Sequence, residues 1–137
     1  IAAAVRVHQY NTVCASSFVQ KAAVTALKEC DDDVENMRRE YERRKNYLVK
    51  TLNEIDGISC NNPKGAFYIL VNIKSLGMTS MEVSDYLLEN AKIATVPGSA
   101  FGSEGEGYIR ISYATSYEQL VEACGRIKKA VAELEKK

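Results

Sequence analysis

The sequence is poor in the residues from which many catalytic and metal sites are built. It contains one histidine, His8, and its four cysteines form no CxxC pair, so it has no ligand pattern for a structural zinc ion and we expect no metal site. A Ser/His/Asp triad would depend on His8, and no GxSxG sequence supports one. Neither a hydrolase nor a metal centre is therefore expected.

The sequence also lacks an excess of charge and a long apolar run. Its 18 basic and 18 acidic residues cancel, which leaves no electrostatic reason to expect binding to nucleic acid or to an anionic membrane. No apolar stretch approaches the length of a membrane span, and the first residues show no signal-peptide pattern. The scattered cysteines favour reduced thiols in a cytoplasmic protein over a secreted disulfide framework; they are Cys14, Cys30, Cys60 and Cys124.

Hydrophobic periodicity and turn residues predict the order of the elements. The order is three helices, one or two strands, a helix, two strands and a last helix. This order predicts an α+β fold, with a small mixed β-sheet packed with helices in a single domain over residues 1–137. The helices are expected at 1–9, 17–30, 32–55, 79–91 and 116–134, and the strands at 58–60, 66–72, 92–96 and 108–113.

Capping pairs and apolar stripes give further expectations for these elements. The third helix should bury Val34 and Met37, and the strand at 66–72 is apolar on both faces, which is typical of a strand covered on each side. Basic residues in the third helix alternate with glutamates at i,i+4 spacing, as in Glu40 and Arg44, which indicates a solvated helix face. Four capping pairs are expected: Ser17 with Gln20, Asp32 with Glu35, Thr79 with Glu82, and Ser116 with Gln119.

The segment 96–114 holds four of the eight glycines and leads into a strand that carries a lone arginine, Arg110. Alternation along the strand places Arg110 on one face and two isoleucines on the other. A guanidinium among large apolar side chains is costly to bury unless it meets an anion. Arg110 therefore either forms an internal salt bridge with an Asp or Glu, which is the commoner arrangement on chemical grounds, or binds a carboxylate or phosphate group of a ligand. The glycine loop lacks a Gly-Lys-Ser/Thr ending and precedes a strand, which excludes a phosphate loop and a Rossmann fingerprint.

Three segments in the same order resemble motifs of one enzyme family. Asn62-Pro63-Lys64-Gly65-Ala66-Phe67-Tyr68 resembles the P-x-G-A-F-Y motif of the class I/II aminotransferases, which are pyridoxal-phosphate (PLP) enzymes of fold type I. The segment 96–102 is similar to their V-P-G-x-x-F-G loop, and 107–114 is similar to their G-x-x-R-x-S strand. The helices at 8–10 and 20–27 resemble those that follow the cofactor lysine in aspartate-aminotransferase-like members.

This resemblance implies a specific role for the chain. It would be the C-terminal, small-domain part of an aminotransferase, with residues 1–30 leading out of a large PLP domain that precedes it. Arg110 would bind the α-carboxylate of an α-amino acid and of a 2-oxo acid, and Phe101 would border the substrate pocket. Aspartate is the amino donor that the resemblance suggests, and the family is usually homodimeric.

The same resemblance implies that the catalytic and cofactor-binding residues lie outside these 137 residues. The cofactor lysine belongs to a motif that the chain does not contain, and none of Lys21, Lys28, Lys45, Lys50, Lys64, Lys74 and Lys92 has a matching context. We therefore expect the chain alone to be inactive and to bind no PLP. The alternative is a stand-alone, non-catalytic α+β domain that binds a small carboxylate through Arg110.

Overall fold

The computed structural model describes residues 1–11 and 14–134, and the chain divides into two compact units, Ile1–Arg38 and Arg39–Lys137. The first unit contains α1 (Ala2–Asn11), α2 (Ser17–Glu29) and the start of α3 (Asp31–Leu52), which continues into the second unit. Neither α1 nor α2 contains a buried residue. The prediction of a single domain is not tested by this division and stays a prediction.

Two of the expected helix starts are wrong. The N-cap of α2 is Ser16, not Ser17, and the Gln20 side-chain amide donates to the carbonyl of Ala15 at 2.8 Å instead of closing a capping box. Helix α3 begins at Asp31, so Asp32 lies inside the first turn, where the helix dipole favours a carboxylate. Several polar residues in a row can each cap a helix, so the sequence leaves the first residue ambiguous.

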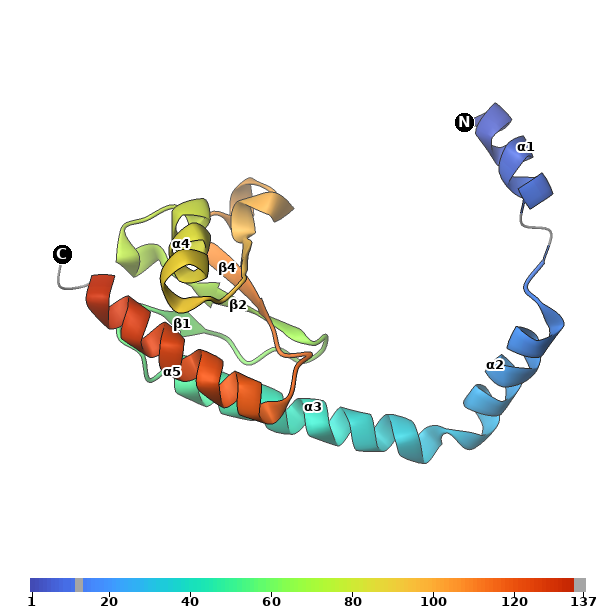
Figure 1. The fold of residues 1–137 in the computed structure, drawn as a ribbon, viewed down its shortest axis with the longest axis horizontal. Helices are drawn as coiled ribbons and strands as arrows, with labels where there is room; N and C mark the ends of the chain where they lie inside the picture. Colours follow the sequence, from blue (N-terminus) through green and yellow to red (C-terminus); the bar gives the residue numbers. More distant parts are fainter. Residues whose placement is uncertain (12–13, 135–137) are drawn as a thin grey trace. The chain divides into compact units, whose positions relative to one another are not determined.

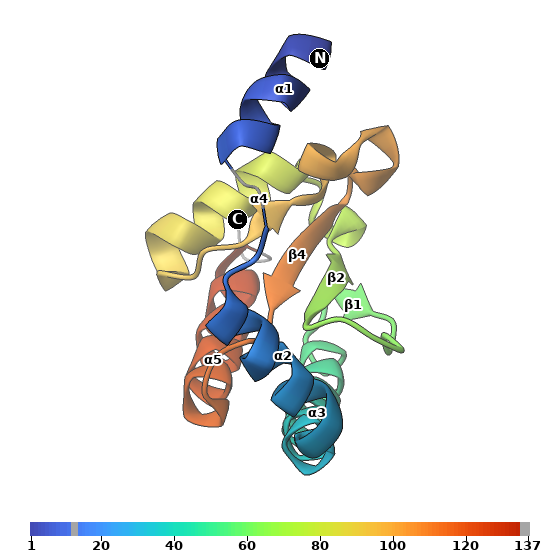
Figure 2. The ribbon, with the colours of Figure 1, turned by 90° about the vertical axis from the view of Figure 1, so that its right-hand side faces the viewer.

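The second unit is built on a four-stranded sheet with the strand order β1-β2-β4-β3 (Figures 1 and 2). All three strand pairs are antiparallel, so the expectation of a mixed sheet is corrected, while the α+β class with helices packed on a small sheet is confirmed. Each strand is short; the four are β1 (Ser59–Cys60), β2 (Tyr68–Asn72), β3 (Val96–Pro97) and β4 (Tyr108–Ser112). The third strand starts later than expected because Lys92 adopts a left-handed φ of 56° and ends the preceding helical turn.

Helices cover one face of this sheet. The part of α3 after Arg38 runs beside α5 (Tyr117–Leu134) below the sheet (Figures 1 and 2). Helix α4 (Ser80–Tyr86) continues into a π-helical turn, Leu87–Ala91. The buried apolar residues form one core within the second unit: Leu48, Leu52, Ile55, Ile69, Val71, Ile73, Val83, Leu87, Ala91, Ile109, Ile111, Tyr113, Leu120, Cys124, Ile127, Ala130 and Val131.

Two burial expectations are wrong. In the first unit, Val34 and Met37 are 57% and 56% exposed rather than buried. In the second, only one face of β2 is covered, since Ile69 and Val71 are buried whereas Tyr68 and Leu70 are 39% and 50% exposed. An apolar pattern shows which faces suit contact, and this chain covers only some of them.

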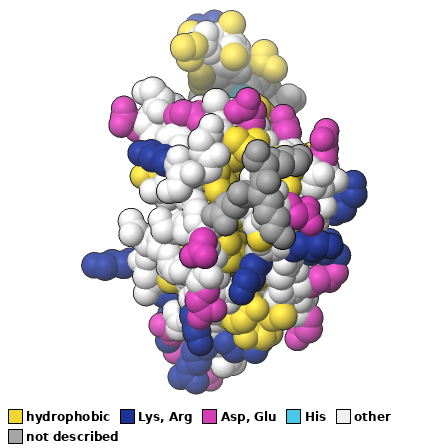
Figure 3. Space-filling model, turned by 90° about the vertical axis from the view of Figure 1, so that its left-hand side faces the viewer, with side chains coloured by type: hydrophobic (Ala, Val, Ile, Leu, Met, Phe, Trp, Pro, Cys, Tyr) yellow, Lys and Arg dark blue, Asp and Glu magenta, His cyan; other side chains and the backbone are white. Residues whose placement is uncertain are grey.

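The described helices include none long and apolar enough to cross a membrane. On the face of the molecule drawn in Figure 3, basic and acidic side chains are interspersed. The predicted pair of Glu40 and Arg44 on α3 is present, with Arg44 Nε 2.8 Å from Glu40 Oε1. The predicted ion pair is therefore confirmed, but Arg44 is partly buried, with 20% of its side chain exposed.

Candidate functional site

Arg110 lies on the open face of the sheet. It is the central residue of β4, where it is half-buried between the buried Ile109 and Ile111. Pairing with the neighbouring strands sets Arg110 opposite Leu70 on β2 and opposite Val96 on β3. Because side chains alternate along a strand, Arg110 extends on the side away from α3 and α5.

The guanidinium of Arg110 contacts two aromatic rings and no carboxylate. Its Cζ lies 4.8 Å from the ring centroid of Phe101 and 5.0 Å from that of Tyr68. Within residues 1–11 and 14–134, the side chain of Arg110 forms no ion pair and no hydrogen bond. Cation–π contacts of this kind contribute about 0.5–2 kcal/mol, depending on desolvation, but leave the N–H donors free. The described residues thus form no salt bridge with Arg110, and its N–H groups are free to donate hydrogen bonds to the carboxylate of another molecule.

The glycine loop that carries Phe101 closes on itself. It contains two 3₁₀ turns, Gly98–Phe101 and Ser103–Gly105, joined at Gly102 with a φ of 113°. A Cβ added to Gly98 would lie 1.9 Å from the Gly105 carbonyl oxygen, and one added to Gly105 would lie 2.0 Å from the Gly98 oxygen. Only glycine fits at either crossing point, so the loop has a defined path.

Glu106, at the end of this loop, binds the start of α4. Its Oε1 accepts the Ser80 backbone N–H at 2.7 Å and that of Gly107 at 3.1 Å, while its Oε2 accepts the Ser80 hydroxyl at 2.9 Å. The hydrogen bonds from the backbone and hydroxyl of Ser80 lower the pKa of Glu106 below its ordinary value. The start of α4 matches the sequence expectation, since Thr79 and Glu82 form a capping box.

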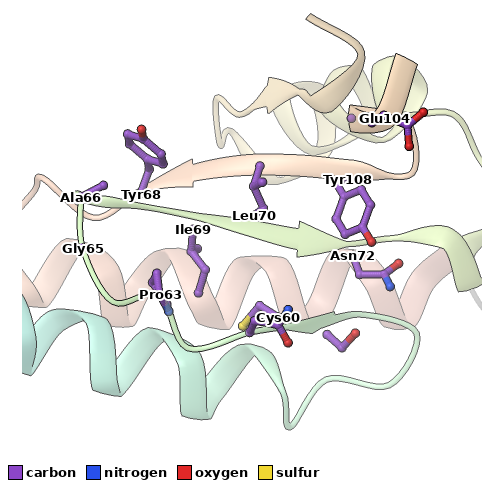
Figure 4. A pocket seen from close by; sticks show the side chains of 13 residues that line it. Cys60, Pro63, Gly65, Ala66, Tyr68, Ile69, Leu70, Asn72, Glu104 and Tyr108 are labelled. Carbon is purple, nitrogen blue, oxygen red and sulfur yellow. The ribbon is translucent and has the colours of Figure 1, made fainter. Parts of the chain in front are cut away.

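A groove of about 600 Å³ lies on the same sheet (Figure 4), and its lining includes Tyr68, which contacts Arg110, and Leu70, which pairs with Arg110. In Figure 4, Ile69 points toward the helices, while Tyr68 and Leu70 point to the opposite side. The turn that forms one wall contains Pro63, Gly65 and Ala66. Sequence reasoning did not find this groove, although the Pro-x-Gly-Ala turn was the available signal.

Backbone strain is present at the wall of the groove. Ala66 has a φ of 63°, which is uncommon for a residue with a Cβ. The buried Tyr113 holds it in place, since the Tyr113 hydroxyl donates to the Ala66 carbonyl at 2.8 Å and the Tyr113 N–H donates to the Phe67 carbonyl at 2.8 Å. Partial burial raises the pKa of the Cys60 thiol, which also lines the groove, and so disfavours its nucleophilic form.

The other residues considered in the sequence lie away from this surface. His8 is exposed on α1, in the first unit. No group of three or more His, Cys, Asp or Glu side chains is placed to hold a metal ion in the part of the chain that the structure describes. Candidate chemistry is thus concentrated around Arg110, Phe101 and Tyr68.

The profile of the family "Aminotransferase class I and II" matches residues 1–127. The chain belongs to this family. Aromatic-amino-acid aminotransferase 2 of Thermococcus litoralis is 51% identical over 94% of the chain and 33% of its own length, and aspartate aminotransferase of Pyrococcus abyssi is 50% identical over the same shares. The crystal structure of an aromatic aminotransferase from Pyrococcus horikoshii OT3 superposes with a TM-score of 0.88 at 48% identity, over 94% of this chain and 35% of that one.

The chain spans about a third of the length of the aminotransferases that it matches. Membership in the family implies PLP for the complete enzymes. No lysine is among the residues that line the groove or contact the guanidinium of Arg110. No catalytic step is therefore assigned to these residues.

Proposed function

We propose that this chain is the C-terminal, small-domain part of a PLP-dependent aminotransferase, in which Arg110 binds the α-carboxylate of the substrate. The observation that carries the proposal is a half-buried guanidinium with two aromatic contacts and no ion pair within the described residues. A carboxylate can receive two parallel N–H···O bonds from the planar fork of an arginine. Amino acid and 2-oxo acid share this group, so one arginine serves both.

The proposal divides the work between this chain and the remainder of the enzyme. PLP, with the lysine that binds it, is proposed to lie outside these 137 residues, so the chain alone is expected to catalyse no transamination. Arg110 would fix the carboxylate end of the substrate, and the ring of Phe101 would border the pocket. The complete enzyme is proposed to act in the cytoplasm as a homodimer.

The amino donor is proposed from the relatives alone. Their names include both aspartate and aromatic amino acids, and aspartate remains our proposal for this protein. The ratio of kcat/KM for aspartate and for phenylalanine, measured on the complete protein, tests this choice. A ratio in favour of phenylalanine would replace aspartate by an aromatic donor.

Substitution of Arg110 by lysine in the complete protein tests the proposed binding role. A lysine keeps the charge but loses the bidentate geometry, so we expect kcat/KM for both the amino acid and the 2-oxo acid to fall about 10- to 100-fold, mainly through KM. The melting temperature should change little because Arg110 has no ion pair within the described residues. Arg126→Lys on α5 is the matched control and should leave KM unchanged.

Two results would count against the proposal. An unchanged KM in Arg110→Lys would remove the substrate role, and an unfolded variant would assign Arg110 to structure. The stand-alone carboxylate-binding domain is favoured if the native polypeptide, detected with an antibody against this chain, has a mass of 15.2 kDa. A much larger native mass favours the aminotransferase.

A further inference from the structure

We infer that Glu106 is a positioning residue that sets the guanidinium of Arg110 through the loop that carries Phe101. This inference depends on the proposed function of Arg110 as the substrate-carboxylate site. Glu106 contacts neither Arg110 nor the groove in the part of the chain that is described, so its effect has to pass through other residues. Three steps connect it to the site.

The first step is the attachment of the loop to α4. The Glu106 carboxylate accepts the N–H and the hydroxyl of Ser80, a residue with no exposed surface. The Ser80 hydroxyl also bonds to the Ser99 hydroxyl at 3.1 Å and accepts the Ser99 N–H at 3.4 Å. Ser80 therefore joins both ends of the loop, one through Glu106 and the other through Ser99.

The second step is the transmission of a shift from Ser80 along the loop to Phe101. Ser99 and Phe101 belong to the same 3₁₀ turn, Gly98–Phe101. The close crossing of Gly98 and Gly105 leaves no room for a Cβ at either position, so the loop has little space in which to rearrange. A shift at Ser80 is then carried to Phe101 instead of being absorbed in between.

The third step is the contact between Phe101 and Arg110. The Phe101 ring is 56% exposed, and its centroid lies 4.8 Å from Arg110 Cζ. With no carboxylate partner among the described residues, the guanidinium is oriented by this ring and by that of Tyr68. Loss of the loop attachment would widen the range of orientations that Arg110 samples and weaken its two-point contact with a substrate carboxylate.

The kinetic signature of such a residue is specific. Both substrates present a carboxylate to Arg110, and the contact is made equally in the ground state and the transition state. We therefore expect Glu106→Gln to raise KM for the amino acid and for the 2-oxo acid roughly three- to tenfold, with kcat within about twofold of wild type. A purely structural role would lower the melting temperature without raising both KM values in parallel.

The experiment is a double-mutant cycle in the complete protein, with Glu106→Gln, Phe101→Leu and the double variant. If Glu106 acts through Phe101, each single variant raises both KM values and the double variant is no worse than the poorer single one. Glu89→Gln is the matched control, because Glu89 is exposed in the π-helical turn and its side chain forms no ion pair or hydrogen bond with the described residues. The inference would be overturned if the rise in KM of the double variant equalled the product of the rises in the two single variants, or if Glu106→Gln left KM unchanged.

Two further variants separate the possible failures. If Glu106→Gln does not fold, Ser80→Ala is the variant to measure. It removes the hydroxyl that bonds to both Ser99 and Glu106 and keeps the N–H bond to Glu106. The same parallel rise in KM is expected, and its absence overturns the inference. Arg110→Lys is measured alongside. If it raises KM whereas Glu106→Gln does not, only the positioning role fails; if Arg110→Lys has no effect, the proposed function fails as well.

Discussion

At the scale of single residues, Glu40 shows how exposed charges are arranged on α3. Its carboxylate accepts hydrogen bonds from Arg43 at 2.9 Å and from Arg44 at 2.8 Å. These bonds, with Arg43 as the larger cause, lower the pKa of Glu40 from 4.5 to about 2. The favourable contacts are therefore complete above about pH 4.5 and are lost as the pH falls through about 2.

This pKa shift predicts a pH-dependent effect of Glu40→Gln. The variant should melt at a slightly lower temperature than wild type at about pH 7, because Arg43 and Arg44 lose an ionised partner. The difference should shrink as the pH is lowered below 4.5 and approach zero near 2. Thermal melts at a series of pH values provide the measurement, with Glu89→Gln as the control. A difference that stays constant with pH would show that the ion pairs do not contribute.

The sequence anticipated Arg110 as a charge needing an anion but not its aromatic contacts. In the sequence, Tyr68 is far from Arg110, and Phe101 is separated from it by part of the glycine loop. Tyr68 contacts Arg110 because β2 pairs with β4, and Phe101 does so because the glycine loop folds back. The capping pairs also show what the sequence can and cannot predict. Thr79 and Glu82 were identified because few alternatives flank them, whereas adjacent serines and aspartates made the starts of α2 and α3 ambiguous.

At the scale of elements, the glycine loop is held by a crossing of two backbone segments. The Gly98 and Gly105 backbones approach so closely that either Cβ would meet a carbonyl oxygen at about 2 Å. Side-chain flexibility cannot relieve such a clash, because the colliding atom belongs to the main chain. The loop must therefore open if Gly98 carries a side chain.

Gly98→Ala should accordingly destabilise the protein by about 1–3 kcal/mol and raise KM by displacing Phe101. Urea unfolding measures the first effect, and substrate titration of the complete protein measures the second. Gly125→Ala on α5 is the control, since no described residue lies within 4 Å of the added Cβ and the helix should gain roughly 0.5–1 kcal/mol. Equal stability in the two variants would show that the close approach of Gly98 and Gly105 does not exclude a Cβ.

The sheet was predictable in outline and not in pairing. Four short strands and their order along the chain followed from apolar segments between turns, but antiparallel pairing throughout depends on how the connections return. The apolar strand β2 looked covered on both faces, yet Tyr68 and Leu70 are exposed on one of them. Periodicity reports which side chains suit contact; it does not say which surface provides that contact.

At the scale of the whole molecule, the buried apolar residues are confined to one part of the sequence, whereas exposed apolar residues occur along all of it. Every buried apolar residue lies between Leu48 and Val131. By contrast, α1 and α2 contain no buried residue, although Phe18, Val24 and Leu27 on α2 are large and apolar. Since the chain covers only a third of its relatives, these side chains are proposed to contact the remainder of the complete enzyme.

This distribution predicts that residues 1–30 contribute little to the stability of the 137-residue chain. Their removal should leave the urea midpoint and the slope of the transition nearly unchanged, because neither α1 nor α2 contains a buried residue. Binding of a hydrophobic dye should fall, because the apolar side chains of α2 are gone. A control truncation after Ser116 removes Leu120, Cys124, Ile127 and Val131 from the core and should abolish the cooperative transition. A clear loss of stability on removing residues 1–30 would mean that α1 and α2 do support the core in solution.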